Sequence, residues 1–77
     1  MRLDLLRDSS GNLHLLERDD HEKITYWHTY GKDAKSARAD IDAWISGAQC
    51  ADWGGNQVRR HDDSEVASMS VVDSVGR

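Results

Sequence analysis

The sequence predicts an α+β fold, in which a three-stranded antiparallel sheet packs against one amphipathic helix in the order βββα. Two N-terminal segments alternate apolar and polar residues, an aromatic-rich segment follows them, and apolar residues then recur at steps of three and four. A chain of 77 residues has room for a single domain. We expect residues 1–60 to form its core and residues 61–77 a C-terminal segment.

The first two strands are expected at about residues 2–8 and 12–18, where leucines occupy alternate positions. A three-residue loop would join them, with Gly11 at the left-handed position that such loops need. This loop sets Leu5 opposite Leu15. The alternate leucines of both strands therefore share one face of the sheet, which must be covered.

The third strand is expected at about residues 23–30, where aromatic and β-branched residues dominate. Large rings fall on both of its faces, with Tyr26 on one face and Trp27 on the other. We interpret them as core residues. The alternative is a stacking platform for single-stranded nucleic acid, with Trp27 and Lys35 among its contacts.

A helix is expected at about residues 33–46, where Asp33 is suited to cap its N-terminus and Gly47 to end it. Its apolar residues form one stripe, which predicts a face packed on the sheet. The expected core residues, taken from the strands and this stripe, are Leu5, Leu15, Ile24 or Tyr26, Ile41 and Trp44.

After the helix the pattern weakens. Residues 57–60 have the composition of a short edge strand, with Trp53 folded back on the core. The last segment mixes serines with β-branched valines, which are poor helix formers. Val66, Met69 and Val72 would share a helical face, whereas Met69 and Val71 alternate as in a strand. We therefore expect a weakly structured C-terminal segment.

Composition narrows the classes of function. The single Cys50 excludes an internal disulfide, which favours a reducing, cytoplasmic environment. No apolar run approaches the roughly 18–20 residues of a membrane span, so we expect a soluble protein without a membrane partner. Fourteen acidic against ten basic residues give a net charge of −4. This balance argues against a surface that binds duplex nucleic acid, because such surfaces cluster Lys and Arg. We expect no direct contact with nucleic acid.

The residues that could carry chemistry do not form a recognisable motif. His14, His21 and His28 are spaced by seven, and no Cys-x-x-Cys or His-x-x-x-His pair accompanies them. A zinc site needs three or four converging ligands, so we expect no metal. There is no phosphate-binding glycine loop and no nucleophile elbow. We expect no enzymatic activity and no cofactor.

What remains is a surface that binds a protein. Carboxylates presented to a basic partner would speed association through charge complementarity. Three groups of acidic residues are the candidates, in the turn before the third strand, on the helix and near the C-terminus: Asp19, Asp20 and Glu22; Asp40 and Asp42; Asp62, Asp63 and Glu65. An uncovered sheet face or edge would leave the alternative of a dimer open.

Two resemblances bear on the partner. A hairpin, a third strand and an amphipathic helix, in that order, are similar to the HicB-type antitoxins, small acidic proteins that bind a toxin. In size, acidity and lack of catalytic residues, the chain resembles the anti-CRISPR inhibitors of phages and mobile elements. The second resemblance implies a host-defence inhibitor that acts on a nucleic-acid-binding protein or complex. The alternatives are an antitoxin-like or regulatory partner and a small module that binds single-stranded nucleic acid.

Overall fold

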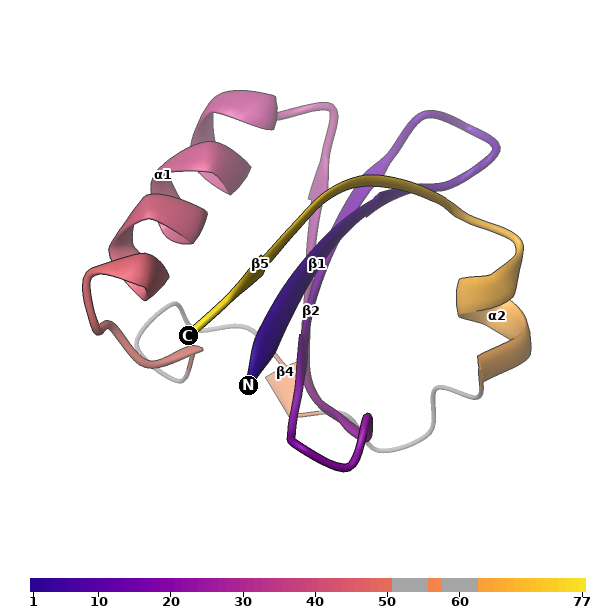
Figure 1. Ribbon diagram of the computed structural model, residues 1–77. Coiled ribbons are helices and arrows are strands. Elements are labelled where there is room, and N and C mark those ends of the chain that lie inside the picture. The colour runs from indigo at the N-terminus through magenta and orange to yellow at the C-terminus, as the bar shows by residue number, and fades with distance from the viewer. Residues whose placement is uncertain (51–55, 58–62) are drawn as a thin grey trace.

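A computed structural model describes residues 1–50, 56–57 and 63–77 (Figure 1). Antiparallel pairing joins the strands into one sheet in the order β4-β3-β2-β1-β5. The prediction of an α+β fold is confirmed, whereas the expected number of three strands is wrong. The elements in chain order are β1 (Arg2–Arg7), β2 (Leu13–Arg18), β3 (Ile24–Gly31), α1 (Ala34–Ile45), β4 (Asn56–Gln57), α2 (Asp63–Ala67) and β5 (Ser70–Gly76).

The hairpin of β1 and β2 has the predicted register. Leu5 lies opposite Leu15, and Arg7 lies opposite Leu13. Gly11 has a φ of 83°, the left-handed conformation that glycine adopts without steric cost. No bound of the first three strands differs from the expected one by more than one residue, because turn chemistry and alternation are local signals.

Helix α1 begins and ends where the sequence indicates. The Asp33 carboxylate accepts a hydrogen bond from the backbone N–H of Ser36 at 3.0 Å, which caps the first turn. Gly47, with a φ of 110°, follows the last turn. The buried face of α1 consists of Ala37, Ile41 and Trp44. In the part of the chain that the structure describes, no helix is long and apolar enough to cross a bilayer.

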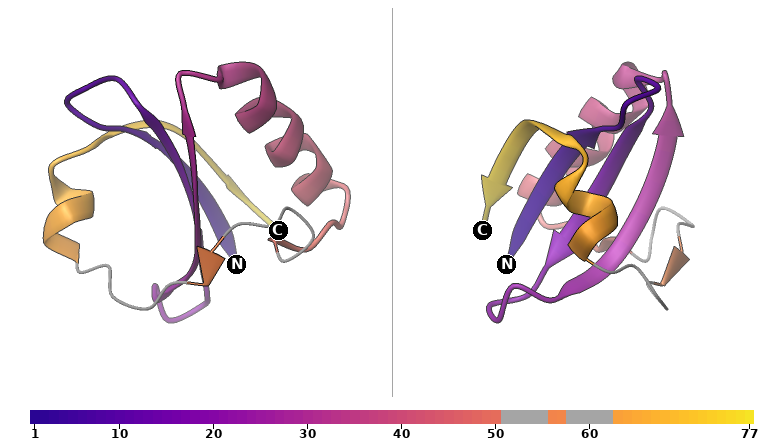
Figure 2. Two further views of the ribbon diagram at one scale, coloured as in Figure 1. Left: turned by 180° about the vertical axis from the view of Figure 1, so that it is seen from behind. Right: turned by 90° about the vertical axis from the view of Figure 1, so that its right-hand side faces the viewer.

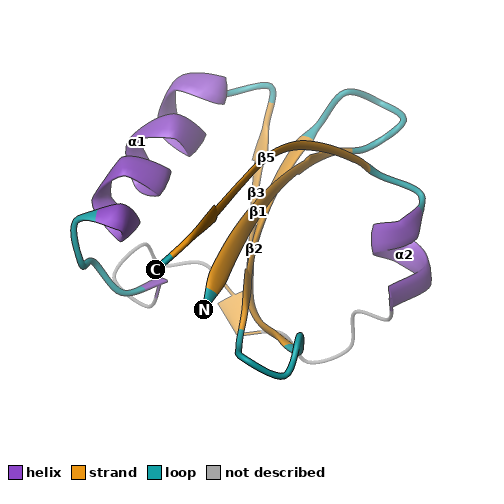
Figure 3. Cartoon of the chain, viewed as in Figure 1, coloured by secondary structure: helices purple, strands orange, loops and turns teal. Residues whose placement is uncertain are grey.

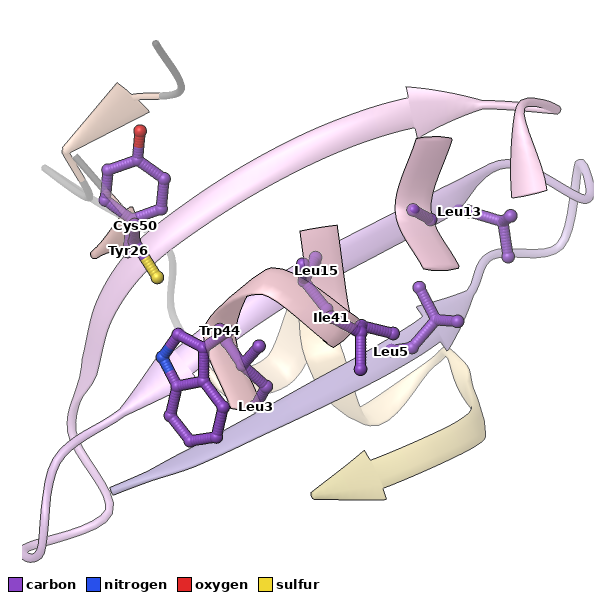
Figure 4. Packing of buried hydrophobic residues seen from close by; sticks show 9 residues of the cluster. Leu3, Leu5, Leu13, Leu15, Tyr26, Ile41, Trp44 and Cys50 are labelled. Atoms are coloured by element: carbon purple, nitrogen blue, oxygen red, sulfur yellow. The ribbon is translucent and has the colours of Figure 1, made fainter. Parts of the chain in front are cut away.

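The main core lies between α1 and the sheet, on what we call the α1 face (Figures 1 and 4). Trp44 is its largest member and is fully buried. The predicted core residues Leu5, Leu15, Ile41 and Trp44 are confirmed, together with Tyr26. The core consists of Leu3, Leu5, Leu13, Leu15, Tyr26, Ala37, Ile41, Trp44 and Cys50.

A second, smaller core lies on the opposite side of the sheet, the α2 face. Leu6, Leu16 and Trp27 are buried there. Val66 of α2 and Met69 pack against them, so the two helices lie on opposite sides of one sheet (Figures 2 and 3). Ile24, which was predicted as a core residue in place of Tyr26, is half-buried beside this cluster. Both faces of the sheet are therefore covered, in part, by apolar side chains.

The expectation of a weakly structured C-terminal segment is wrong for residues 70–76. They form β5, which pairs with β1 along its length and sets Val75 opposite Leu3. The register shifts at one point, between Leu5 and Leu6 of β1. The β-branched valines favour a strand once a partner strand is present. At the other edge, β4 pairs with residues 26–27 of β3; the rest of the predicted edge strand, 58–60, and Trp53 lie outside the described residues.

Candidate functional site

The turn between β2 and β3 holds the first group of predicted acidic residues. Asp19 accepts the backbone N–H groups of His21 and Lys23, at 2.8 and 3.0 Å. Both hydrogen bonds lower the pKa of Asp19, and the bond from Lys23 has the larger effect. Asp19 therefore orders the turn. Asp20, in contrast, has a side chain that is 84% exposed, and one of its oxygens lies 2.9 Å from the amino group of Met1.

Glu22 belongs to a network of charges that reaches β1 and β2. Its carboxylate accepts hydrogen bonds from both Nη groups of Arg2, at 3.0 and 2.7 Å. Such bidentate pairs are geometrically specific. The Arg2 Nε also donates to Asp4, and Arg18 donates to the backbone oxygen of Glu22 at 2.8 Å. The Glu22 side chain is 65% exposed and paired with Arg2, whereas the Asp20 side chain is 84% exposed and lies beside the amino group of Met1.

The second group lies on α1, and its two members differ. Asp42 is exposed, as the prediction of an acidic helix flank requires. Asp40 is half-buried and accepts a hydrogen bond of 2.5 Å from the Tyr30 hydroxyl of β3. Burial, with the bond to Asp40, raises the pKa of Tyr30. Asp40 therefore connects the helix to the sheet, and Asp42 is the carboxylate open to a partner.

The third group lies on the other side of the sheet. Asp63 begins α2 and Glu65 is an exposed residue of the same helix, whereas Asp62 lies outside the described residues. Because α1 and α2 cover opposite faces, the groups on the two helices cannot contact one flat surface together (Figure 2). The predicted acidic residues of α1 and of α2 therefore lie on separate surfaces.

The proposed stacking platform is divided by the fold. Tyr26 is 7% exposed in the main core and Trp27 is 5% exposed in the second core. Alternation along β3 sends the two rings to opposite faces, where the leucines cover them. His28 and Tyr30 stack on each other with ring centroids 4.4 Å apart. Tyr26 and Trp27 have no open face for a base.

A buried polar cluster in the main core escaped the sequence analysis. Glu17 is 8% exposed, and its carboxylate accepts the indole N–H of Trp44 at 2.8 Å and the thiol of Cys50 at 3.3 Å. The Thr25 hydroxyl donates to the other oxygen at 3.0 Å. Figure 4 shows Trp44 and Cys50 at this end of the core. Glu17 continues the alternation of Leu13 and Leu15, which is the signal that would have placed it inside.

The chemistry open to this cluster is limited by its surroundings. Burial, together with the bond to Glu17, raises the pKa of Cys50 to about 12, so the thiol keeps its proton at neutral pH. The Arg77 guanidinium lies 4.3 Å from the ring centroid of Trp44 and donates to the backbone oxygens of Trp44 and Ala48. These contacts hold the end of α1 in place. Among the described residues, no three His, Cys, Asp or Glu side chains are grouped to hold a metal ion.

The hydrogen bonds of Asp8, in the loop between β1 and β2, can be tested by the pH dependence of stability. The pKa of Asp8 is lowered from 3.8 to about 2, first by the bond with His14 and then by the backbone N–H groups of Asn12 and Ser10. A carboxyl whose pKa is lower in the folded state stabilises the fold above about pH 4 and loses this contribution as the pH falls towards 2. Asp8→Asn should therefore lower the denaturation midpoint at pH 5, and the difference should vanish near pH 2.

Urea denaturation at a series of pH values measures this difference. The matched control is Asp20→Asn, at an exposed position of the other hairpin turn. If the Asp8→Asn difference were the same at pH 5 and pH 2, the hydrogen bonds to the ionised carboxylate would not contribute to stability.

Comparison with known proteins adds no assignment: no protein-family model, no curated protein and no solved structure matches this chain.

Proposed function

We propose that this protein is a non-enzymatic protein-binding module, an anti-CRISPR-like inhibitor that acts through acidic patches on a nucleic-acid-binding protein. The observation that carries the proposal is the turn between β2 and β3. Asp19 and Arg18 hold its backbone through hydrogen bonds, while the Asp20 side chain remains 84% exposed beside the amino group of Met1. A charge held on an ordered turn loses little conformational entropy on binding.

The state of the other polar groups supports the same proposal. The carboxylates of Asp4 and Glu17 are buried and hydrogen-bonded to side chains of the fold. The Cys50 thiol is held protonated, and Asp40 is bound to Tyr30. Groups engaged in this way stabilise the fold, which favours a role for the exposed charges instead. Asp42 on α1 is the second exposed carboxylate that we assign to the binding surface.

A basic cleft that normally binds nucleic acid is the partner that this surface suits. Exposed carboxylates would occupy the positions of phosphates, and long-range attraction would raise the association rate at low ionic strength. The patches on α1 and on the turn need not act together. A partner could bind the patch on α1 or the patch on the turn, and separate substitutions in the two patches distinguish these cases.

The test is a comparison of charge-reversed variants with a matched control. Proteins captured from a host lysate by the immobilised wild type are identified by mass spectrometry, and their association rates are then measured with the purified partner. Asp20→Lys should slow association by about tenfold or more at low salt if the partner binds the turn, and Asp42→Lys should do so if it binds α1. The double variant should slow association in either case. The control, Lys23→Glu with Lys35→Glu, changes exposed cations of the same two elements and should not slow it.

Two outcomes would contradict the proposal. One is association that is indifferent both to the aspartate reversals and to ionic strength. The other is tight binding to single-stranded DNA or RNA in a gel-shift titration at low salt, which would restore the nucleic-acid alternative. Loss of capture with the double reversal but not with the lysine variants supports the acidic patches.

The edge strand β5 supports the alternative of an antitoxin-like or regulatory partner. Of the strands that the structure describes, β5 is outermost on its side, and Val71 and Val72 are 67% and 41% exposed. An edge of this kind can accept a strand from another protein. Val71→Lys would abolish such an association without affecting one that depends on Asp20 and Asp42.

A further inference from the structure

His14 of β2 lies on the α2 face and makes hydrogen bonds at both ring nitrogens. Its Nδ1 accepts the indole N–H of Trp27 at 3.1 Å, and its Nε2 lies 2.9 Å from an oxygen of Asp8. The two rings meet edge to face, with centroids 5.8 Å apart. The His14 side chain is 12% exposed. Both nitrogens are therefore engaged by groups of the fold.

The partners determine where the imidazole proton lies. The indole N–H of Trp27 can only donate, so Nδ1 must offer a lone pair. The ionised carboxylate of Asp8 can only accept, so Nε2 carries the proton. The hydroxyl of Thr29, 3.3 Å from Nδ1, can donate or accept. The arrangement requires neutral His14 in the Nε2–H tautomer.

A second proton on His14 can be added only at Nδ1. An N–H at Nδ1 would face the indole N–H of Trp27, and two donors cannot share a hydrogen bond. The Thr29 hydroxyl can turn to accept from the new N–H, while Asp8 continues to accept from Nε2. Asp8 stays ionised throughout, because its pKa is lowered to about 2 by the bond with His14 and by the backbone N–H groups of its loop. The protonated ring thus has two partners, and Trp27 is the one it rejects.

Trp27 also belongs to the cluster of the sheet against which α2 packs. With Leu6 and Leu16 it forms the second core, and Val66 of α2 and Met69 pack against this cluster. A displacement of the indole therefore disturbs the apolar surface on which α2 rests. Leu6, which lies opposite His14 on β1, is apolar and offers the charged ring no hydrogen-bond partner from its side chain.

We infer that His14 is a pH-sensitive switch, in which protonation exchanges its bond from Trp27 for one to Thr29 and loosens α2 from the sheet. Histidine changes charge between about pH 5 and 8, the range in which such a switch operates. The inference does not depend on the proposed function, because it concerns the α2 face and involves neither Asp20 nor Asp42.

The test is a pH titration followed by NMR on the full chain. The ring nitrogens of His14 report its tautomer and charge, and the indole N–H of Trp27, assigned with Trp27→Phe, reports the hydrogen bond. Between pH 8 and pH 4.5, we expect the two signals to change with one midpoint, together with the resonances of Val66 and Met69. At pH 8 the nitrogen shifts should show the Nε2–H tautomer.

Three variants make the result specific. His14→Gln removes the titrating group, so the Trp27 and Val66 signals should stop changing with pH. Thr29→Val removes the acceptor of the charged form and should move the midpoint to lower pH. His21→Gln, in the exposed turn, should leave both signals as in the wild type. The inference is overturned if His14 titrates while Trp27 keeps its signal, or if His14 stays neutral down to pH 4.5.

Discussion

Replacing Trp44 by alanine is expected to remove a large share of the protein's stability. The side chain is fully buried in the main core. Removing a buried tryptophan costs about 3–5 kcal/mol in the free energy of unfolding. A domain of this length has a total of roughly 4–12 kcal/mol, at about 0.05–0.15 kcal/mol per residue. The variant also removes the N–H that Glu17 accepts at 2.8 Å.

Circular dichroism in urea measures this loss, and two further variants divide it into its causes. Trp44→Phe keeps an aromatic ring in the core but removes the donor to Glu17, so it should cost about 1–3 kcal/mol beyond the change in packing. Ile45→Ala changes the next residue, which is 53% exposed, and should stay within about 0.5 kcal/mol of the wild type. A Trp44→Ala protein as stable as Ile45→Ala would show that α1 does not pack as described.

Asp4→Ala should destabilise the protein by about 3 kcal/mol, because it removes the carboxylate of a largely buried ion pair with Arg18. The Asp4 carboxylate accepts from Arg18 at 3.2 Å, from Arg2 at 3.0 Å and from the Ser74 hydroxyl at 2.6 Å. These donors come from β2, β1 and β5. The effect is placed at the lower end of the range for buried ion pairs, since Arg2 is 40% exposed and can turn to water.

The location of the damage distinguishes this effect from a general loss of stability. Amide hydrogen exchange should quicken most in β5, which Ser74 ties to Asp4, and less between β2 and β3. The control Asp20→Ala removes an exposed carboxylate that lies beside the amino group of Met1, and should cost less than about 1 kcal/mol. Equal effects of Asp4→Ala and Asp20→Ala would mean that the buried network does not hold the strands together.

The candidate site was predictable in part. Asp20 and Asp42 are exposed, as acidic residues in a turn and on a polar helix flank are expected to be. The spacing of Asp40 on the helix did not reveal that it lies within reach of the Tyr30 hydroxyl. The pairing of Glu22 with Arg2 joins residues 20 positions apart, and the sequence contains no signal for it. Ion pairs between distant segments depend on how the strands align.

The local elements were determined by the sequence itself. The hairpin register, the left-handed Gly11 and the Asp33 cap follow from turn and capping chemistry, which acts over a few residues. The stripe of α1 likewise determined that Ile41 and Trp44 face the sheet.

Only the tertiary structure decided the remaining architecture. β5 is a strand because β1 has a free edge beside it, and the hydroxyl of Ser74 reaches Asp4 from 70 residues away. Trp27 is buried because Val66 and Met69 return to cover the α2 face. Glu17 is tolerated inside because Trp44, Cys50 and Thr25 supply donors from three other segments. Contacts at such separation depend on which edges and faces the folded core leaves open, and residue type alone does not specify them.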